Sequence, residues 1–428
     1  MGLWLFLERS KISEVAAGPI GSASKLVELS KPSIAVLPLK NRSGDQGQEY
    51  FSDGVTEDII NSLSRFSGLL VIARSSSFTF KEKPVSASEA AQRLGVRYIL
   101  EGSIQKSAEH VRVSIQLVDA TTGTNRWVDR FDRPVADIFV LQDEITQRVV
   151  STLIAHITRA EIERAVRKSA PDLGAYDFTL RGRALRLRYK RADTEEAVQL
   201  LEQAVTLDPN FAPAHVELGH AYRIKSNQRW SSEPAKDLNR ASDLAQRAIT
   251  LDPALAEAHA LLGSVYVLQG RFEDALAANE RAIALNPNDA DSYARLAVAL
   301  TRAGHPKQAI DNIKDAIRLD PFYPPIYLAY LGRAHYLARE YDKAVPVLKR
   351  CAERVPELST CRGWLAASYA QLSRNVSARE ELAHWRRLRP GVTAQQYRHD
   401  QAQGYAKSAD FDHVMDGLKK AGLSDSGD

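Results

Sequence analysis

The segment LGSVYVLQGRFEDALAANERAIALNP occupies residues 262–287, and LAVALTRAGHPKQAIDNIKDAIRLDP follows in the same frame at residues 296–321. Each segment contains two apolar helical runs and ends in an Asn-Pro or Asp-Pro pair. Proline lacks the N–H that a helix interior requires, and it disfavours helical dihedral angles in the preceding residue. Each segment therefore predicts a pair of helices that stops at its last residue.

The same ending recurs along the second half of the chain. The prolines that close the apolar runs are Pro209, Pro253, Pro287, Pro321, Pro356 and Pro390. Successive intervals between them are 44, 34, 34, 35 and 34 residues. A glycine or alanine follows a leucine in the first run of each later unit, as at Gly263 and Ala297. Small residues there would let paired helices approach closely. The pattern resembles tetratricopeptide (TPR) repeats, whose period is 34 residues. The resemblance covers about residues 175–390, or about six repeats.

The first interval is ten residues longer than the period, and the excess falls in Ile224–Asp237. Its polar residues predict an extended loop between helices, which carries Trp230. Two interpretations stay open: Trp230 contacts a partner, or it folds back over its own repeat. The first unit is rich in arginine over residues 181–191. This stretch is either a solvated face or a surface for an acidic partner or lipid headgroups.

Stacked helix pairs form a superhelix whose concave wall is lined by the first helix of each pair. That wall is a site for an extended peptide or a partner helix, so we expect protein or peptide partners. The repeat frame predicts these wall residues: His220, Arg223, Ser264, Thr301, Arg333 and Tyr336. The Lys and Asn positions of chaperone-type TPR proteins are occupied here by residues such as Val216 and Ala260, which disfavours that activity. An apolar stripe within Gln401–Leu423 predicts a helix that caps the last repeat, so that residues 391–428 form a cap and tail.

Residues 32–157 have a different pattern, that of an α/β domain. Short apolar strands are expected over Ser33–Pro38 and Leu69–Ile72, with helices over Thr56–Phe66 and Ala87–Leu94. Three antiparallel strands are expected over Tyr98–Gln105, Val111–Val118 and Asn125–Phe131, followed by a helix over Asp137–Ile157. A linker helix over residues 158–174 would join this domain to the repeats. The predicted fold class is thus a mixed α/β domain followed by an all-α superhelix.

Four motifs in this domain occur together: Ser33–Pro38, Glu49–Asp58, Leu94–Ser103 and Leu141–Ile145. Together they resemble the TolB N-terminal-like domain. In bacterial proteins such a domain precedes TPR arrays, and it follows either a class III adenylate cyclase domain or a winged-helix DNA-binding domain, usually after one transmembrane helix. The resemblance implies a regulatory part of a signalling protein, related either to the cyclases or to the membrane-bound transcription activators.

Residues 1–31 are expected to be an apolar stub and a linker. Met1–Leu7 is apolar but too short to span a bilayer, which needs around 20 residues. The resemblance implies that this stub is the end of a membrane helix. Location therefore depends on what precedes it: cytoplasmic for a complete chain, and the periplasmic side of the inner membrane if an upstream helix exists. Cys351 and Cys361 are expected to be small core residues in neighbouring helices, with a disulfide as the alternative.

Charge and motifs give little sign of catalysis. The 57 basic and 53 acidic residues nearly balance, so nucleic acid is not an expected partner. We find no cofactor motif, no metal-binding cysteine or histidine spacing and no cyclase aspartate pair. Arg74, Ser75 and Ser76 form a candidate anion-binding loop, with a plain polar loop as the alternative. Asp53 and Glu57–Asp58 are expected to begin a helix, with cation binding as the alternative. The chain is predicted to act by binding partners rather than by catalysis.

Overall fold

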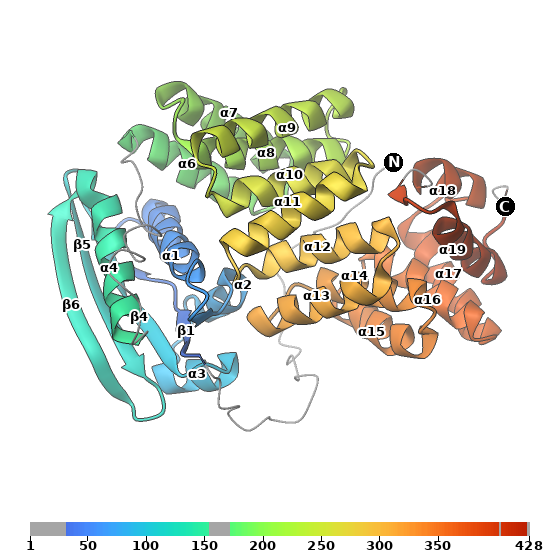
Figure 1. The fold of residues 1–428 in the computed structure, drawn as a ribbon, viewed down its shortest axis with the longest axis horizontal. Helices are drawn as coiled ribbons and strands as arrows, with labels where there is room; N and C mark the ends of the chain where they lie inside the picture. The colour runs from blue at the N-terminus through green and yellow to red at the C-terminus, as the bar shows by residue number, and fades with distance from the viewer. Residues whose placement is uncertain (1–30, 154–171, 402–403, 426–428) are drawn as a thin grey trace.

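The computed structural model describes residues 31–153, 172–401 and 404–425, and Figure 1 shows a β-sheet domain beside a curved array of helices. The predicted fold class is confirmed. Predictions for the apolar stub, for most of the linker and for residues 158–171 lie outside the described residues.

The sheet is mixed, with the strand order β3-β1-β4-β5-β6 and with β2 also paired to β4. Pairs among β1, β3 and β4 are parallel, whereas β4, β5 and β6 form an antiparallel meander. The strands are β1 (Ser33–Val36), β2 (Lys40–Asn41), β3 (Leu70–Val71), β4 (Tyr98–Lys106), β5 (His110–Asp119) and β6 (Thr124–Pro134). The three predicted antiparallel strands are therefore present, each slightly longer than expected.

Alternating side chains of β1 serve two different cores. Ile34 and Val36 pack with α1 and α4, whereas Ala35 and Leu37 pack with α3 on the other side. The helices of this domain are α1 (Glu49–Ser64), α2 (Arg74–Ser77), α3 (Ala87–Leu94) and α4 (Ile138–Leu153), with short 3₁₀ turns at Gln46–Gln48, Phe78–Phe80 and Val135–Asp137. Because side chains alternate between faces along a strand, the central strands are buried on both sides.

Helix α1 begins seven residues earlier than predicted. Asp45 caps the preceding 3₁₀ turn by accepting a bond from the N–H of Gly47, and this turn runs directly into α1. The prediction that Asp53 and Glu57–Asp58 begin the helix is therefore wrong. They lie inside α1, where Asp53 pairs with Lys81 at 2.8 Å and Asp58 is buried.

Six helix pairs follow in the described residues. They are α6 (Leu173–Arg186) with α7 (Arg191–Leu207), α8 (Ala212–Asn227) with α9 (Pro234–Leu251), α10 (Ala256–Leu268) with α11 (Phe272–Leu285), α12 (Ala290–Ala303) with α13 (Pro306–Leu319), α14 (Ile326–Leu337) with α15 (Tyr341–Arg354), and α16 (Ser359–Gln371) with α17 (Asn375–Leu388). Residues before the prolines leave the helical region as predicted: Asp208 has φ −134° and ψ 90°, and Asn286 has φ −137° and ψ 87°.

Small residues allow the two helices of a pair to approach. A Cβ atom added to Gly263 would lie 2.4 Å from Nδ2 of Asn279, and one added to Gly332 would lie 2.4 Å from Cγ of Leu348. Both distances are shorter than any ordinary carbon contact. The predicted role of these positions in close helix packing is therefore confirmed.

The inserted segment is more helical than expected. Helix α8 continues to Asn227 and α9 starts at Pro234, so that only residues 228–233 form the loop. A proline fits the first turn of a helix because the N–H it lacks has no helical partner there. Trp230 packs edge-to-face on Tyr189 of the preceding pair, with 6.4 Å between the ring centroids.

The C-terminal region forms two helices, α18 (Ala394–Gln401) and α19 (Ser408–Lys420). Helix α19 packs against α16 and also against α14, both of them first helices of a pair. Ala406 donates its N–H to the carbonyl of Arg302 in α12. The predicted cap is therefore present but differently placed, since it extends back over first helices of earlier repeats.

Cys351 of α15 and Cys361 of α16 are both buried, and a disulfide joins them. Their Cα atoms lie 6.0 Å apart, on either side of the turn between two repeats. The expectation of two unlinked core cysteines is therefore wrong, and the alternative interpretation describes the structure.

Candidate peptide-binding surface

The first helices of the pairs form one continuous layer. Helix α8 contacts both α6 and α10, and α12 contacts both α10 and α14. Outside its own pair, a second helix meets mainly the first helix of the following pair, as α11 meets α12. In a curved stack, the layer with contacts along its whole length is the inner one. This layer consists of α6, α8, α10, α12 and α14 (Figure 1), and the side chains on its inner side are called the inner wall below.

The inner wall is basic and aromatic. Its charged and aromatic members come from four helices: Arg183 and Arg186 of α6, His220 and Arg223 of α8, Arg295 and Arg302 of α12, and Tyr330 and Arg333 of α14. Most of them are strongly or half buried, and Arg333 is only 8% exposed. A guanidinium group in such a position loses much of its hydration and needs an acceptor.

Some of these arginines have acidic partners within the chain. Nε of Arg183 and Nε of Arg186 bind the two carboxylate oxygens of Glu217 at 2.9 and 2.7 Å. Burial opposes ionisation of Glu217, but the two arginines keep the pKa of Glu217 below its ordinary value. Arg295 lies 3.6 Å from Asp291 and 4.0 Å from Asp289. These three arginines are neutralised internally.

Three further arginines lack such partners. Nε of Arg223, Nε of Arg302, and both Nε and Nη2 of Arg333 are buried without a hydrogen-bond acceptor. Arg302 donates only through Nη1, to the carbonyl of Gly404 at 2.9 Å. Burial lowers the pKa of Arg223 and of Arg302, and the nearby charge of Arg333 lowers the pKa of Arg302 further. The inner wall therefore holds three guanidinium groups with donor atoms that no acceptor of the described residues satisfies.

Tyr330 shows that distant helices face one another across the curve. Burial raises the pKa of Tyr330, while the positive charges of Arg333 and Arg223 act in the opposite direction. Arg223 belongs to α8 and Tyr330 to α14, with α10 and α12 between them in the chain. The positive charges of Arg223 and Arg333 thus both act on Tyr330, and that of Arg333 also acts on Arg302.

The residues predicted for the concave wall have different environments. His220, Arg223 and Arg333 belong to the basic group just described. Ser264 is half-buried and donates to the carbonyl of Ala260, and Thr301 is buried and donates to the carbonyl of Ala297. These two hydroxyls satisfy the backbone of their own helices.

Tyr336 is not available to a partner, in contrast to its prediction. It is fully buried beneath α19, where its hydroxyl donates to the carbonyl of His413 at 3.0 Å and its ring stacks on the His413 ring. The repeat frame could not predict this, because α19 is not part of the repeat. The sequence analysis did not predict Arg295, Arg302 and Tyr330 as residues of the wall. Arg295 and Arg302 could have been found, because their spacing of seven residues places both on one face of a helix.

The candidate anion loop is occupied by the chain itself. Arg74 lies in α2 and binds Glu57 at 2.8 Å, and the hydroxyls of Ser75 and Ser76 both donate to the carboxylate of Asp320. The predicted anion site thus binds a carboxylate of the repeat array, at the Asp-Pro turn that follows α13. Its role is to join the two domains.

A second contact between the domains lies at α6. The Asp58 carboxylate accepts bonds from the hydroxyl of Tyr176 at 2.6 Å and from Nε2 of Gln142 at 3.2 Å. Nη1 of Arg183 lies 3.3 Å from the other Asp58 oxygen. The Asp58 carboxylate therefore has three partners, and two of them, Tyr176 and Arg183, belong to α6.

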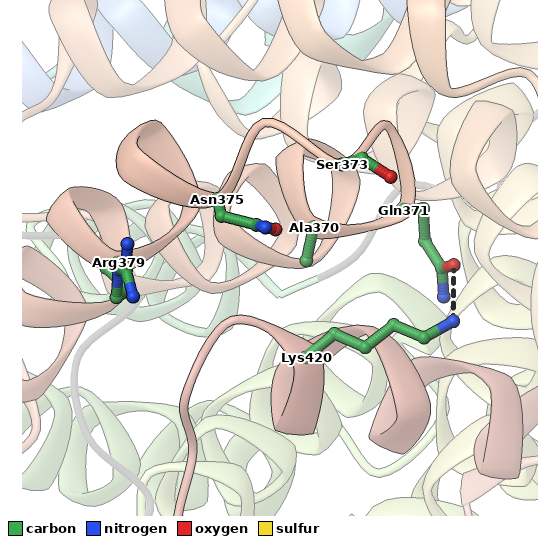
Figure 2. A pocket seen from close by; sticks show the side chains of 6 residues that line it. All are labelled: Ala370, Gln371, Ser373, Asn375, Arg379 and Lys420. Atoms are coloured by element: carbon green, nitrogen blue, oxygen red, sulfur yellow. Dashed lines mark hydrogen bonds between the residues drawn. The ribbon is translucent and has the colours of Figure 1, made fainter.

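A hollow in the surface of the described part of the chain lies elsewhere. Figure 2 shows it between the turn joining α16 to α17 and the end of α19, where Lys420 reaches toward Gln371. It encloses about 440 Å³ and is lined by Ala370, Gln371, Ser373, Asn375, Arg379 and Lys420. Lys420 binds Asp416 at 2.7 Å and donates to Oε1 of Gln371 at 3.3 Å, so its ammonium group already has acceptors within the chain.

Within the described ranges, no three His, Cys, Asp or Glu side chains are arranged to hold a metal ion. None of the helices described is both long and apolar enough to cross a membrane.

Comparison with known proteins identifies the repeat. Residues 263–304 match a family model described as TPR repeat, and residues 294–359 match one described as tetratricopeptide repeat. The chain contains TPR repeats. Residues 30–148 match the model for the second domain of HilA/YgeH-like transcriptional regulators. The resemblance of this domain to the TolB N-terminal-like domain stays a prediction.

The chain is 42% identical over 211 residues to a protein of Rhizobium meliloti (strain 1021) named putative adenylate cyclase 3. The aligned region is 49% of this chain and 36% of that protein, so the chain spans about a third of this relative. Among solved structures, Pseudomonas aeruginosa pilF is similar with 21% identity and a TM-score of 0.41, covering 54% of this chain and 99% of pilF. A thermophilic TPR protein of Thermus thermophilus is 19% identical with a TM-score of 0.37, covering 45% of this chain and 98% of that protein.

Proposed function

We propose that this chain is a non-catalytic interaction and regulatory module of a bacterial signalling protein, whose inner wall binds a segment of a partner protein. The observation that carries the proposal is the set of inward-facing guanidinium groups, at Arg223, Arg302 and Arg333, with donor atoms that lack acceptors. TPR repeats are protein-interaction scaffolds, and their concave side is suited to extended segments. The α/β domain binds the inner wall at Arg183 of α6, and the unsatisfied donors of Arg223, Arg302 and Arg333 are left for a partner.

Site-specific photo-crosslinking in cells tests this proposal. A photoreactive amino acid replaces Ser264, which is half-buried on α10, or Glu280, which is exposed on the second helix α11 of the same pair. We expect a discrete protein adduct from the Ser264 position and none from the Glu280 position, with the crosslink mapping to one segment of the partner. Identical adducts from both positions, or none from either, would contradict the proposal.

Two larger contexts are supported by different comparisons. The relative named putative adenylate cyclase supports a position next to a cyclase, and the match of residues 30–148 supports a transcriptional regulator. We favour the cyclase-linked context because its identity of 42% extends over 49% of the chain. Incubation of the purified chain with ATP and magnesium or manganese should give no cyclic AMP. Formation of cyclic AMP that scales with the chain concentration would overturn the non-catalytic assignment.

A further inference from the structure

The inner wall contains an uneven distribution of charge that suggests the chemistry of its partner. Glu217 forms ion pairs with both Arg183 and Arg186, and Arg295 forms ion pairs with both Asp289 and Asp291. Glu217, Asp289 and Asp291 are therefore already paired with these arginines. Arg223, Arg302 and Arg333 are left with unsatisfied donors, each at a half-buried or buried position.

A buried guanidinium group without an acceptor is costly, and several such groups close together repel one another. Arg333 adds to the positive potential at Arg302, and Arg295 and Arg186 add to it at Arg223. A ligand with negative groups would remove both the repulsion and the unsatisfied donors. Carboxylates fit best, because a guanidinium group and a carboxylate form paired, parallel hydrogen bonds.

From these observations we infer that the inner wall binds an extended polypeptide segment with spaced Asp or Glu side chains, whose carboxylates pair with Arg223, Arg302 and Arg333. This inference rests on the proposed function and names the chemistry of the partner. The guanidinium group of Arg333 lies over the ring of Tyr330, 5.7 Å from the ring centroid, and this ring would offer an aromatic surface to the apolar side chains of such a segment.

The charge pattern favours a polypeptide over a nucleic acid. Asp289, Asp291 and Glu217 interrupt the basic wall, and Glu257 at the start of α10 has a buried carboxylate oxygen without a partner. A phosphate backbone carries charge at every step and would meet these acids. Separate carboxylates on a peptide can be placed opposite the arginines alone. The chain as a whole has a formal charge of only +4, so it offers no broad field for a polyanion.

Fluorescence anisotropy with the full chain tests the inference. The probe is a labelled ten-residue peptide with glutamate at alternate positions, and its control has glutamine at those positions. We expect the glutamate peptide to bind at least about tenfold more tightly, since charge-assisted bonds are stronger than neutral ones. The double variant Arg223→Gln/Arg333→Gln should lose this preference for glutamate. The double variant Arg281→Gln/Lys349→Gln changes the net charge equally but on exposed second helices, and it should bind as the wild type does.

Thermal unfolding of the wild-type chain gives a second measurement that needs no variant. The glutamate peptide should raise the melting temperature and the glutamine peptide should not, because only a ligand bound to the folded state stabilises it. Equal binding of the two peptides would overturn the inference, and so would equal loss in both double variants. A single-stranded oligonucleotide of the same charge that bound as tightly as the glutamate peptide would also overturn it.

The crosslinking experiment distinguishes this inference from the proposed function. A discrete adduct from the Ser264 position together with no preference for glutamate would refute the acidic partner and leave the proposed function standing. Loss of both signals would refute both.

Discussion

The α/β domain meets the repeat array at two places whose chemistry differs. At the first, Asp58 of α1 is buried with Tyr176 and Arg183 of α6, and Arg183 also binds Glu217. At the second, Asn288 and Asp320 stand in the turns that precede α12 and follow α13. Asn288 donates to the carbonyls of Ser64 and Leu69, and Asp320 accepts from two serines.

The two contacts differ in how much stability the chain should lose when one of their residues is replaced. The first contact consists of ionised groups removed from water, where loss of one partner leaves another charge buried. The second is formed by hydrogen bonds to hydroxyl and backbone groups, supported by apolar packing of Leu319 and Ala290 under the sheet. The first should therefore dominate the stability of the interface, while the second fixes its position.

Together the two contacts span the array from its first to its fourth helix pair. A rigid α/β domain bound to α6 and to the turns around α12 and α13 holds the curvature between them. Helices α6, α8, α10 and α12 of the inner wall lie within that span, and α14, which carries Tyr330, follows in the fifth pair. We therefore expect the position of Arg223 relative to the rest of the wall to depend on both contacts. Loosening either one should disturb partner binding as well as stability.

The largest expected effect is that of Arg183→Ala. The substitution leaves Asp58 and Glu217 buried without their shared cation, which should lower the free energy of unfolding by about 3–5 kcal/mol. The midpoint of urea unfolding, followed by circular dichroism, measures it. Arg191→Ala removes an exposed partner of Glu195 and should cost at most about 0.5 kcal/mol. Equal midpoints for the two variants would show that the first contact contributes little.

These interactions also mark the limit of what the sequence could predict. Helix ends at Asp208 and Asn286, and the close packing at Gly263, follow from a few neighbouring residues, and the structure agrees with them. The partners of Asp58 and of Ser75 lie at least 84 residues away in the chain, and no local pattern points to them. The start of helix α1 was predicted too far along the chain because Asp58 was interpreted as an acidic residue of the first helical turn. In the structure Asp58 is a buried residue of the interface between the domains.

The sequence also predicts the inner wall only in part. The repeat frame identified His220, Arg223 and Arg333 because the period of 34 fixes which positions face inward. It placed Tyr336 there as well, but α19 covers that residue. Whether an inward-facing arginine is paired depends on side chains of its own helix or of a neighbouring helix, such as Glu217 of α8 for Arg183 of α6. The period does not predict those side chains.

The turn that carries Asn288 also predicts a pH dependence of stability, through Asp289. Asp289 adjoins Asn288, and burial raises the pKa of Asp289 from 3.8 to about 6, although Arg295 acts in the opposite direction. Between pH 4 and pH 6 the folded chain therefore holds a proton at this carboxyl that the unfolded chain has lost. This group makes stability fall as pH rises through that range, and its contribution is constant above pH 6.

Asp289→Asn removes that contribution. The free energy of unfolding of the variant, minus that of the wild type, should rise by about 1–3 kcal/mol from pH 4 to pH 6 and then level off. Other titrating groups are common to both chains and cancel in the difference. Urea unfolding at half-unit pH steps measures it. A difference that stays flat, or that falls as pH rises, would mean that Asp289 is not protonated in the folded chain near pH 5.

The smallest expected effect is that of Ser75→Ala, which removes one of the two hydroxyls that donate to Asp320. Because Ser76 still binds the same carboxylate, the expected loss is about 0.5–1.5 kcal/mol. Hydrogen exchange is the better measurement, since the loss should appear as faster exchange of residues 74–80 and of the turn at Asp320, without change at α6. Ser88→Ala, at an exposed position with only a 3.5 Å bond to the carbonyl of Ala120, should leave both regions unchanged. If exchange also accelerated at α6 in Ser75→Ala, the two contacts would open together, and the separation of a dominant ionic contact from a positioning contact would have to be abandoned.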